Sequence, residues 1–235
     1  MTHGAFITAT GTGAGKTYVT RGIARSLVRR GTRPIALKPL ETGVAPDPLD
    51  AIALANACGR PRLATEPAFY RARAPVAPYA AWLQDGIPTP DLARITQRIR
   101  ELASDADSIW IEGAGGLLVP IDAHNSMADF AARLDWPILL VAPDQLGVLS
   151  HVLTAIESAE RRGLGVAAVV LTRLAPNPDD SSTRSNALIL EERLKRPILQ
   201  FAHCRDDDDE LADAADACGV FATLLTRRPE PPPAP

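Results

Sequence analysis

A short stretch near the start of the chain combines glycines, a lysine and a threonine in an order suited to binding phosphate. Residues 11–17 read Gly-Thr-Gly-Ala-Gly-Lys-Thr. In a glycine-rich turn, successive backbone N–H groups can converge on an anion, and a lysine that follows can neutralise the terminal phosphates. Lys16 stands where that lysine is needed, and Thr17 stands where a hydroxyl binds Mg2+. The spacing therefore predicts chemistry on a nucleoside triphosphate.

The segments on either side of this loop support the prediction. The apolar, β-prone residues 5–8 precede the loop, and a pattern with Val19, Ile23 and Leu27 on one helical face follows it. The strict pattern G-x-x-x-x-G-K-[S/T] asks for glycine at position 10, where this chain has Thr10. A flexible turn before a helix would also explain the composition, but the order of strand, Gly-Lys-Thr and helix favours a phosphate loop. The nucleotide-binding residues expected from the loop are Thr12, Gly13, Ala14, Gly15, Lys16 and Thr17.

Two further expected strands end in charged side chains. Lys38 closes the apolar residues 34–38, and Glu112 closes residues 108–112 before a turn with three glycines among four residues. Ligands of open α/β sheets bind at the carboxyl ends of the strands, and phosphate-loop enzymes place an acidic group there to hold magnesium or its water shell. Glu112 is therefore the best candidate for a metal ligand. Lys38, taken alone, is better explained as a solvated lysine at a strand end.

Asp50 and His151 are each open to two interpretations. Asp50 directly precedes an Ala-rich helical stretch, residues 51–57, and the pattern alone favours a helix cap over a ligand. His151 lies at the start of a helix expected from about residue 150 to 162. A solvated histidine at a helix end explains it at least as well as a ligand contact.

Composition narrows the class of protein. The chain has 235 residues, 46% of them hydrophobic, and a net charge of −3, so no broad electrostatic attraction to nucleic acid is expected. The three cysteines lack C-x-x-C spacing, which argues against a zinc site or a disulfide framework. There is no signal-like N-terminus and no apolar run of membrane-spanning length. We expect a cytoplasmic protein that acts on small molecules and binds neither nucleic acid nor a membrane.

The order of elements predicts the fold class. Nearly continuous apolar strands alternate with helices, which indicates an α/β protein with a mostly parallel central sheet and helices on both faces. With the phosphate loop, this is a three-layer P-loop NTPase-type fold, expected as a single domain over residues 1–228. The Pro-rich residues 229–235 are expected to be extended and disordered. The acidic run at residues 206–210 is expected to face water without any chemistry, because consecutive carboxylates on one loop repel each other.

Together these motifs resemble the dethiobiotin synthetase family. The resemblance rests on the phosphate loop, residues 38–43 (KPLETG), 50–51 (DA), 75–79 (PVAPY), 112–116 (EGAGG) and 146–147 (LG), and His151. Members of this family use ATP and CO2 to close a cyclic urea on a diamino acid, 7,8-diaminononanoate. The resemblance therefore implies a ligase that forms C–N bonds, with ATP as co-substrate and Mg2+ as cofactor.

The resemblance also implies roles for individual residues. Lys16 and Lys38 would act at the phosphates and the carbamate, with Thr42 beside them. Thr17, Asp50 and Glu112 would surround the magnesium ion, which makes Asp50 more than a cap. The residues implied to border the diamino acid are Thr42, Gly115, Gly116, Gly147, Ser150 and His151. The segment from Gly147 to His151 would come from the partner subunit of a homodimer, whose active site then lies at the subunit interface.

Two positions depart from the family pattern. Family loops usually begin Gly-Thr-Asp-Thr, whereas residues 9–12 read Ala-Thr-Gly-Thr and lack both the first glycine and the aspartate. After the strand expected at residues 166–172, the family reads the adenine edge with an asparagine, and Thr172 stands there. We expect Thr172 to contact the nucleotide but to discriminate bases less well, because a hydroxyl is a less directional partner than an amide.

Other functions of phosphate-loop proteins remain alternatives. A related amidoligase, such as a cobyrinate-type synthetase, usually carries an added glutaminase domain, for which 235 residues leave little room. A small-molecule kinase is a further enzymatic alternative. A regulatory ATPase of the partitioning type usually has a second lysine five positions before the catalytic one, and here that position is Gly11.

Overall fold

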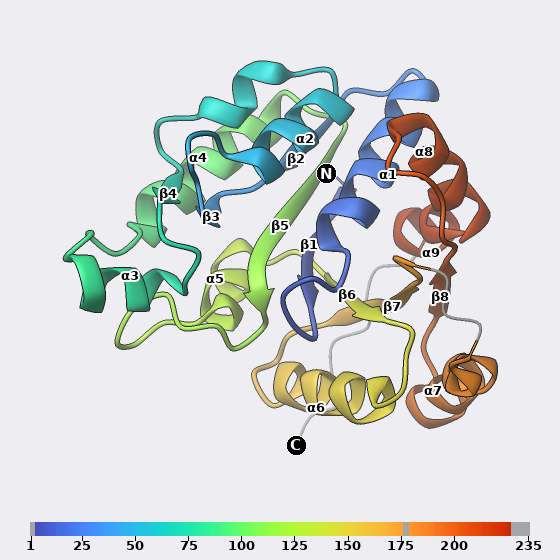
Figure 1. The fold of residues 1–235 in the computed structure, drawn as a ribbon. Helices are drawn as coiled ribbons and strands as arrows, with labels where there is room; N and C mark the ends of the chain where they lie inside the picture. The colour runs from blue at the N-terminus through green and yellow to red at the C-terminus, as the bar shows by residue number, and fades with distance from the viewer. Residues whose placement is uncertain (1–2, 176–178, 227–235) are drawn as a thin grey trace.

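The centre of the molecule is a six-stranded sheet in which every described strand pair is parallel (Figure 1). The computed structural model describes residues 3–175 and 179–226. In spatial order the strands are β2 (Pro34–Leu37), β5 (Ser108–Gly116), β1 (His3–Ala9), β6 (Ile138–Pro143), β7 (Val166–Thr172) and β8 (Ile198–Phe201). The predicted α/β fold class with a mostly parallel sheet is confirmed.

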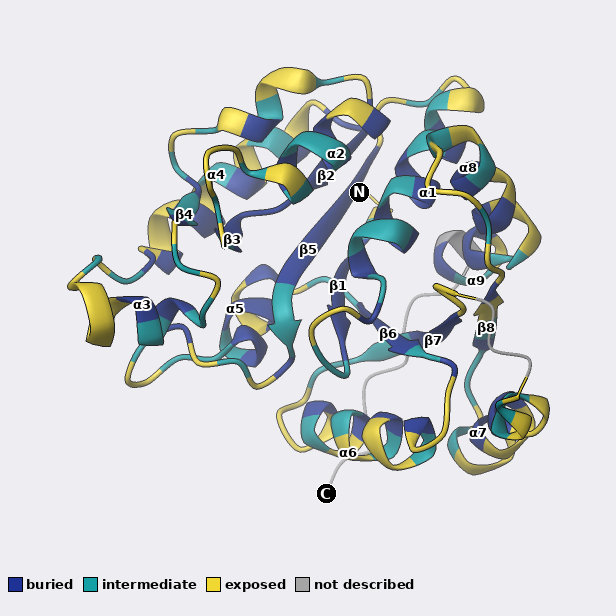
Figure 2. Cartoon of the chain, viewed as in Figure 1, coloured by how far each residue is buried: buried dark blue, intermediate teal, exposed yellow. Residues whose placement is uncertain are grey.

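Helices cover both faces of this sheet and bury it almost completely (Figure 2). Successive side chains of a strand point to opposite faces, so Phe6 of β1 packs in one apolar cluster while Ala5 and Ile7 pack in the other. One face packs against α1 (Lys16–Arg29), α2 (Leu49–Ala57), α8 (Asp208–Ala217) and α9 (Val220–Thr226). The opposite face packs against α4 (Leu92–Ser104), α5 (Met127–Leu134), α6 (Val148–Glu160) and α7 (Asn186–Leu194).

A small second sheet, which the sequence did not predict, lies next to the carboxyl end of β2. Its two parallel strands are β3 (Leu40–Thr42) and β4 (Tyr70–Ala72). The remaining elements are α3 (Pro78–Asp85) and two 3-10 turns, η1 (Pro61–Thr65) and η2 (Ser181–Arg184). β3 therefore holds Glu41 and Thr42 a few residues beyond Lys38.

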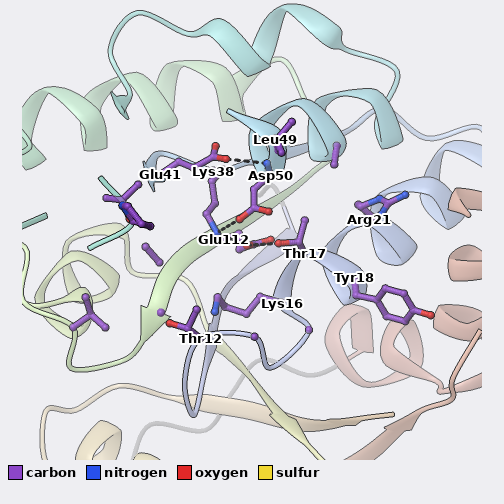
Figure 3. A pocket seen from close by; sticks show the side chains of 18 of the residues that line it. Thr12, Lys16, Thr17, Tyr18, Arg21, Lys38, Glu41, Leu49, Asp50 and Glu112 are labelled. Carbon is purple, nitrogen blue, oxygen red and sulfur yellow. Dashed lines mark hydrogen bonds and ion pairs between the residues drawn. The ribbon is translucent and has the colours of Figure 1, made fainter. Parts of the chain in front are cut away.

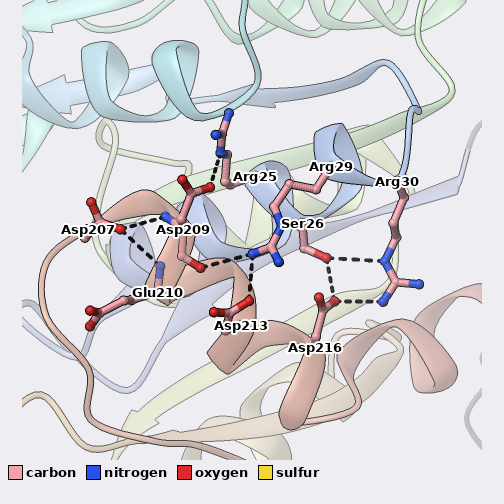
Figure 4. Close-up of polar contacts among 9 residues, drawn as sticks. All are labelled: Arg25, Ser26, Arg29, Arg30, Asp207, Asp209, Glu210, Asp213 and Asp216. Carbon is pink, nitrogen blue, oxygen red and sulfur yellow. Dashed lines mark hydrogen bonds and ion pairs between the residues drawn. The ribbon is translucent and has the colours of Figure 1, made fainter.

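The acidic run at residues 206–210 is mostly exposed to water, as expected, but three of its aspartates also pair with arginines of α1. Asp207 caps α8 by accepting from the backbone N–H groups of residues 209 and 210. Along the two helices, Arg25 pairs with Asp209, Arg29 with Asp213 and Arg30 with Asp216 (Figure 4). Because each helix turns once in 3.6 residues, side chains about four apart share one face and can form such a ladder.

Two other expectations concern the Pro-rich segment and the absence of a membrane-spanning helix. The Pro-rich residues 229–235 lie outside the described residues. Over the described ranges, none of the helices has both the length and the apolar composition needed to cross a membrane.

Candidate functional site

The phosphate loop joins the end of β1 to the start of α1, as its sequence predicts. Gly15 is the N-cap of α1 and has a φ of 90°, a left-handed conformation that glycine adopts without strain. A Cβ atom at Gly15 would lie 2.9 Å from Leu174 Cδ2 and 3.2 Å from Thr172 Cγ2. Thr10, where the strict motif has glycine, continues the sheet by donating its N–H to the Val141 carbonyl at 3.0 Å. The departure at Thr10 therefore leaves the turn itself intact.

Lys16 reaches back across the loop from the first turn of α1. Its Nζ atom donates to the Gly11 carbonyl oxygen at 3.3 Å, and its side chain is buried. Burial, together with the positive charge of Lys38, lowers the pKa of Lys16 to about 8. The site thus already contains two buried ammonium groups, an arrangement that favours the arrival of an anion.

Lys38 joins two carboxylates from separate parts of the chain (Figure 3). Its Nζ atom lies 2.5 Å from Glu112 Oε1 of β5 and 2.9 Å from Asp50 Oδ2 of α2. Burial opposes the charge of Lys38, but the two carboxylates outweigh that effect and raise its pKa. Asp50 loses solvent as well, yet Lys38 and a bond from Thr17 lower its pKa. The ion pair between Lys38 and Asp50 thus stabilises the charged form of both groups.

Glu112 has one oxygen in use and one free. Thr17 Oγ1 donates to Glu112 Oε1 at 2.9 Å, the same oxygen that Lys38 contacts. The other oxygen, Oε2, is buried and has no hydrogen-bond partner among the described residues. The register of β5 against β1 shifts just after this residue, between Ile7 and Ala9, and such bulges re-aim side chains near sites. A buried, unpartnered carboxylate oxygen beside a threonine hydroxyl is a donor set that fits a hard cation or its water shell.

The same residues line a cavity of about 810 Å³ at the carboxyl ends of β1, β2 and β5. Its wall includes all the loop residues predicted to bind nucleotide except Ala14, which is buried beneath the loop. It also includes Lys38, Thr42, Asp50, Glu112 and Gly115. Within the described ranges, no group of three or more His, Cys, Asp or Glu side chains is arranged to hold a metal. A cation bound here would therefore take further ligands from phosphate oxygens and water, as Mg2+ commonly does.

Four of the predicted substrate residues do not line this cavity in the single chain. Gly116 lies in β5 just beyond Gly115, while Gly147, Ser150 and His151 lie at the start of α6. Gly147 is the N-cap of α6, and no side chain caps that helix end. The nearby Leu146 is 80% exposed. The prediction that this segment borders the diamino acid stays a prediction.

Thr172 contacts the phosphate loop from the end of β7. Its hydroxyl donates to the Ala14 carbonyl oxygen at 2.8 Å and lies 3.3 Å from the Ala142 carbonyl oxygen. The side chain is buried and does not line the cavity. The expected contact with the base stays a prediction; the contact that the structure shows is with the loop backbone.

Two findings at α2 go beyond the sequence or correct it. Asp50 lies in the first turn of α2, whose N-cap is Pro48, so the prediction that Asp50 is a helix cap is wrong. The backbone N–H groups of Asp50 and Ala51 instead donate to the carboxylate of Glu41, which was not predicted as a site residue. The only sequence signal was the position of Glu41 between Lys38 and Thr42, within residues 38–43 on which the resemblance partly rests.

The chain is similar to known proteins over most of its length. Residues 3–202 match the family described as AAA domain. The chain is 40% identical over 199 residues to the ATP-dependent dethiobiotin synthetase BioD of Anaeromyxobacter sp. (strain K), covering 83% of this chain and 88% of that protein. It is 37% identical over 183 residues to the protein of the same name from Caulobacter vibrioides (strain NA1000 / CB15N), covering 76% and 83%.

A likeness to solved structures supports the fold. The septum site-determining protein MinD of Pyrococcus horikoshii OT3, complexed with Mg-ADP, superposes with a TM-score of 0.56 at 15% identity, covering 91% of this chain and 86% of that one. At such low identity the likeness shows the fold alone. The identity to the two synthetases extends over most of both chains. This chain therefore belongs to the family of ATP-dependent dethiobiotin synthetases.

Proposed function

We propose that this protein is an ATP-dependent dethiobiotin synthetase, a ligase that forms C–N bonds in biotin biosynthesis. It would carboxylate 7,8-diaminononanoate with CO2, phosphorylate the carbamate and close the cyclic urea to give dethiobiotin, ADP and phosphate. The observation that carries the proposal is the convergence of Lys16, Lys38 and the Thr17–Glu112 pair on one cavity, in a chain 40% identical to a synthetase of that name.

Catalysis of this reaction depends mainly on positive charge that neutralises the reacting anions. A carbamate oxygen attacks the γ-phosphate in line, and the second amine then displaces phosphate from the mixed anhydride and closes the ring. Two anions must meet in the first of these steps, so neutralising and orienting them supplies most of the catalysis. Lys16 would neutralise the transferred phosphoryl group, and Lys38 would act beside it; both line the cavity, which supports these roles. No side-chain nucleophile is needed.

Mg2+ is the cofactor that this site suits. Thr17, Asp50 and Glu112 would hold it, supported by the unpartnered Oε2 atom of Glu112 and by the hydroxyl that Thr17 directs to the same carboxylate. When bound, the ion supplies further positive charge at the β- and γ-phosphate oxygens. Lys38 would hold the two carboxylates close to each other through its two ion pairs.

We also propose that the protein is a cytoplasmic homodimer with its active sites at the subunit interface. The support is structural: the start of α6 carries uncapped N–H groups, which suit a carboxylate, yet Gly147 and His151 lie outside the cavity of their own chain. The 80% exposed Leu146 beside them would be covered in such a dimer. The diamino acid would then lie between the two chains.

An assay with labelled bicarbonate tests the function directly. The purified protein is incubated with 7,8-diaminononanoate, ATP, MgCl2 and bicarbonate carrying heavy carbon, and the products are read by mass spectrometry. We expect dethiobiotin with the label in its urea carbonyl, together with an equal amount of ADP. Samples without the diamine show whether ATP is hydrolysed on its own. ADP formation that does not depend on the diamine, with no dethiobiotin, would contradict the proposal and favour a regulatory ATPase.

A further inference from the structure

The helix that carries Asp50 has no cap of its own. α2 runs from Leu49 to Ala57, and its N-cap, Pro48, makes no side-chain hydrogen bond to the helix. The first N–H groups of any helix lack partners within that helix, and leaving them unpaired away from water is costly. The start of α2 lies at the cavity wall, where Leu49 and Asp50 both line it. A group outside α2 must therefore accept hydrogen bonds from its first N–H groups.

Glu41 supplies the missing cap from a different segment. Its Oε1 atom accepts from the Asp50 N–H at 2.8 Å, and its Oε2 atom accepts from the Ala51 N–H at 3.1 Å. Both oxygens of one carboxylate are thus used on consecutive amides at the positive end of the helix dipole. In Figure 3 the Glu41 side chain points to the start of α2 on the side opposite to the Lys16 loop.

The carboxylate of Glu41 is buried although it forms no ion pair within the described part of the chain. It is 6% exposed, and it forms no ion pair with any other residue that the structure describes. Burying an ionised carboxylate is unfavourable unless hydrogen bonds to it compensate, and charge-assisted bonds from N–H groups are among the strongest that can. Burial raises the pKa of Glu41, while the bonds from Asp50 and Ala51 oppose that rise. The two N–H bonds, together with the nearby positive charge of Arg71, therefore stabilise the charged form of Glu41.

The residue whose backbone Glu41 holds is the same one whose side chain pairs with Lys38. With its N–H fixed by Glu41, Asp50 directs its carboxylate to Lys38, 2.9 Å away. Lys38 and Glu41 are three positions apart in the chain, so the same short segment holds both the backbone and the carboxylate of Asp50. We propose that Glu41 is a positioning residue, which caps α2 from outside and thereby presents the Asp50 carboxylate to the magnesium ion. This assignment rests on the proposed function, in which Asp50 is a metal ligand.

Three variants separate this role from a general loss of stability. Glu41→Ala removes both acceptors, and Glu41→Gln keeps the size of the side chain but leaves only one oxygen for two N–H groups. Asp91→Ala is the matched control, because Asp91 caps α4 by accepting from the Arg94 N–H at 3.0 Å and does not line the cavity. All three lose carboxylate caps, but only the first two act on the helix of Asp50.

The first measurement needs no substrate. Hydrogen–deuterium exchange is followed over the start of α2, and loss of a cap should speed exchange there by about fivefold or more in Glu41→Ala, with a smaller effect in Glu41→Gln. Asp91→Ala should speed exchange at the start of α4 and leave α2 unchanged. Wild-type exchange at α2 in the Glu41 variants would overturn the capping role, whatever reaction the protein catalyses.

The second measurement is the Mg2+ concentration that half-saturates ADP binding, followed by calorimetry. We expect about a fivefold increase in Glu41→Ala, and no change in Asp91→Ala. In the Asp50→Asn background the Glu41→Ala change should have almost no further effect, since Glu41 acts through Asp50. Equal effects of Glu41→Ala in both backgrounds would overturn the proposal and point to a direct contact with the ligand. Because neither measurement uses the diamine, a failure of the proposed reaction would be seen separately, as absence of dethiobiotin from the wild-type protein.

Discussion

The ammonium of Lys38 lies 2.5 Å from the carboxylate of Glu112, and both side chains are withdrawn from water, with exposed fractions of 6% and 0%. A buried ion pair of this kind contributes little beyond what apolar side chains would contribute, but removing one partner leaves the other charge uncompensated. The pair is therefore a point where function and stability depend on the same atoms.

Replacing Lys38 by methionine should destabilise the folded protein as well as stop turnover. Loss of one partner of a buried pair costs about 3–5 kcal/mol, and here the cost is the isolated charge of Glu112. Urea unfolding followed by circular dichroism measures it. The double variant Lys38→Met/Glu112→Gln should recover part of the lost stability. If Lys38→Met unfolds at the wild-type urea concentration, the pair is not energetically coupled in solution.

Lys16→Ala should abolish activity while leaving most of the stability. Lys16 donates to the Gly11 carbonyl at 3.3 Å and lines the cavity, where in the proposed reaction its charge would face the transferred phosphate. Removing one such contact costs about 3–4 kcal/mol in the transition state, or hundreds-fold in kcat. Steady-state kinetics of dethiobiotin formation measure the effect, with the exposed Lys195→Ala as control. A folded Lys16→Ala protein with near-normal kcat would rule out the phosphate-loop assignment.

Thr172→Val should weaken nucleotide binding without altering the preference among bases. The change keeps the shape of the side chain but leaves the Ala14 carbonyl without its 2.8 Å partner. Leaving a buried group unpaired costs about 1–3 kcal/mol, which should raise the KM for ATP about tenfold. Thr96→Val is the control, because the buried Thr96 hydroxyl has no partner among the described residues.

The four nucleoside triphosphates distinguish the two possible roles of Thr172. If the hydroxyl only holds the loop, kcat/KM should fall by the same factor for ATP, GTP, CTP and UTP. A change in their ratio would instead show that Thr172 reads the base, as the family resemblance predicts.

At acidic pH, the contact of Asp216 in α8 with Ser26 and Arg30 in α1 should stop stabilising the protein. Ser26 and Arg30 donate to Asp216 Oδ1 at 2.5 and 2.7 Å. Partial burial disfavours the charged form of Asp216, but these two bonds outweigh burial and lower its pKa. An aspartate with a lowered folded pKa stabilises the protein above its ordinary pKa of about 3.9, and this contribution is lost as the pH falls further. Asp216→Asn should therefore reduce stability at pH 7 by less than about 1 kcal/mol and flatten its decline in acid.

Chemical denaturation between neutral pH and the acid limit measures this pH dependence. Asp85→Asn is the control, since Asp85 is exposed at the end of α3 and has no ion pair within the described ranges. If Asp216→Asn and Asp85→Asn show the same curves, the ion pair with Arg30 does not contribute in solution.

A shared active site can be tested by mixing two inactive chains. Lys16→Ala and His151→Ala are co-expressed with different tags, and the mixed dimer is purified through both tags. One of its two sites then contains Lys16 from one chain and His151 from the other, so activity should exceed that of either variant alone. A monomer by light scattering at assay concentrations, or no recovery in a mixed dimer, would contradict the shared site.

The phosphate loop and the sheet could be predicted because their signals are local. Residues 11–17 combine the required residue types in one turn, and apolar runs such as residues 137–142 identify strands that are buried on both faces. Strand-end placement also identified Glu112, since the carboxyl ends of parallel strands meet at one edge.

Other parts of the site depend on contacts between distant segments, which a local pattern does not contain. Whether the carboxylate of Asp50 caps its own helix or turns to Lys38 depends on where the end of β2 lies. The contact of the Thr172 hydroxyl with the Ala14 carbonyl joins residues 158 positions apart, so no local pattern could have predicted it. The aspartates of residues 206–210 are exposed as expected, but nothing in the local sequence shows that arginines of α1 pair with them.

The ion pairs between α1 and α8 affect the order in which the chain folds during its synthesis. The arginines of α1 find their aspartates only 184 to 187 residues further along the chain. On the ribosome, α1 therefore emerges well before α8, and its arginines stay without these partners until α8 has been made. Contacts of such long sequence separation form late. A fragment that ends before residue 206 would thus contain the whole phosphate loop but not α8. The unpaired arginines of its α1 could then bind other anions.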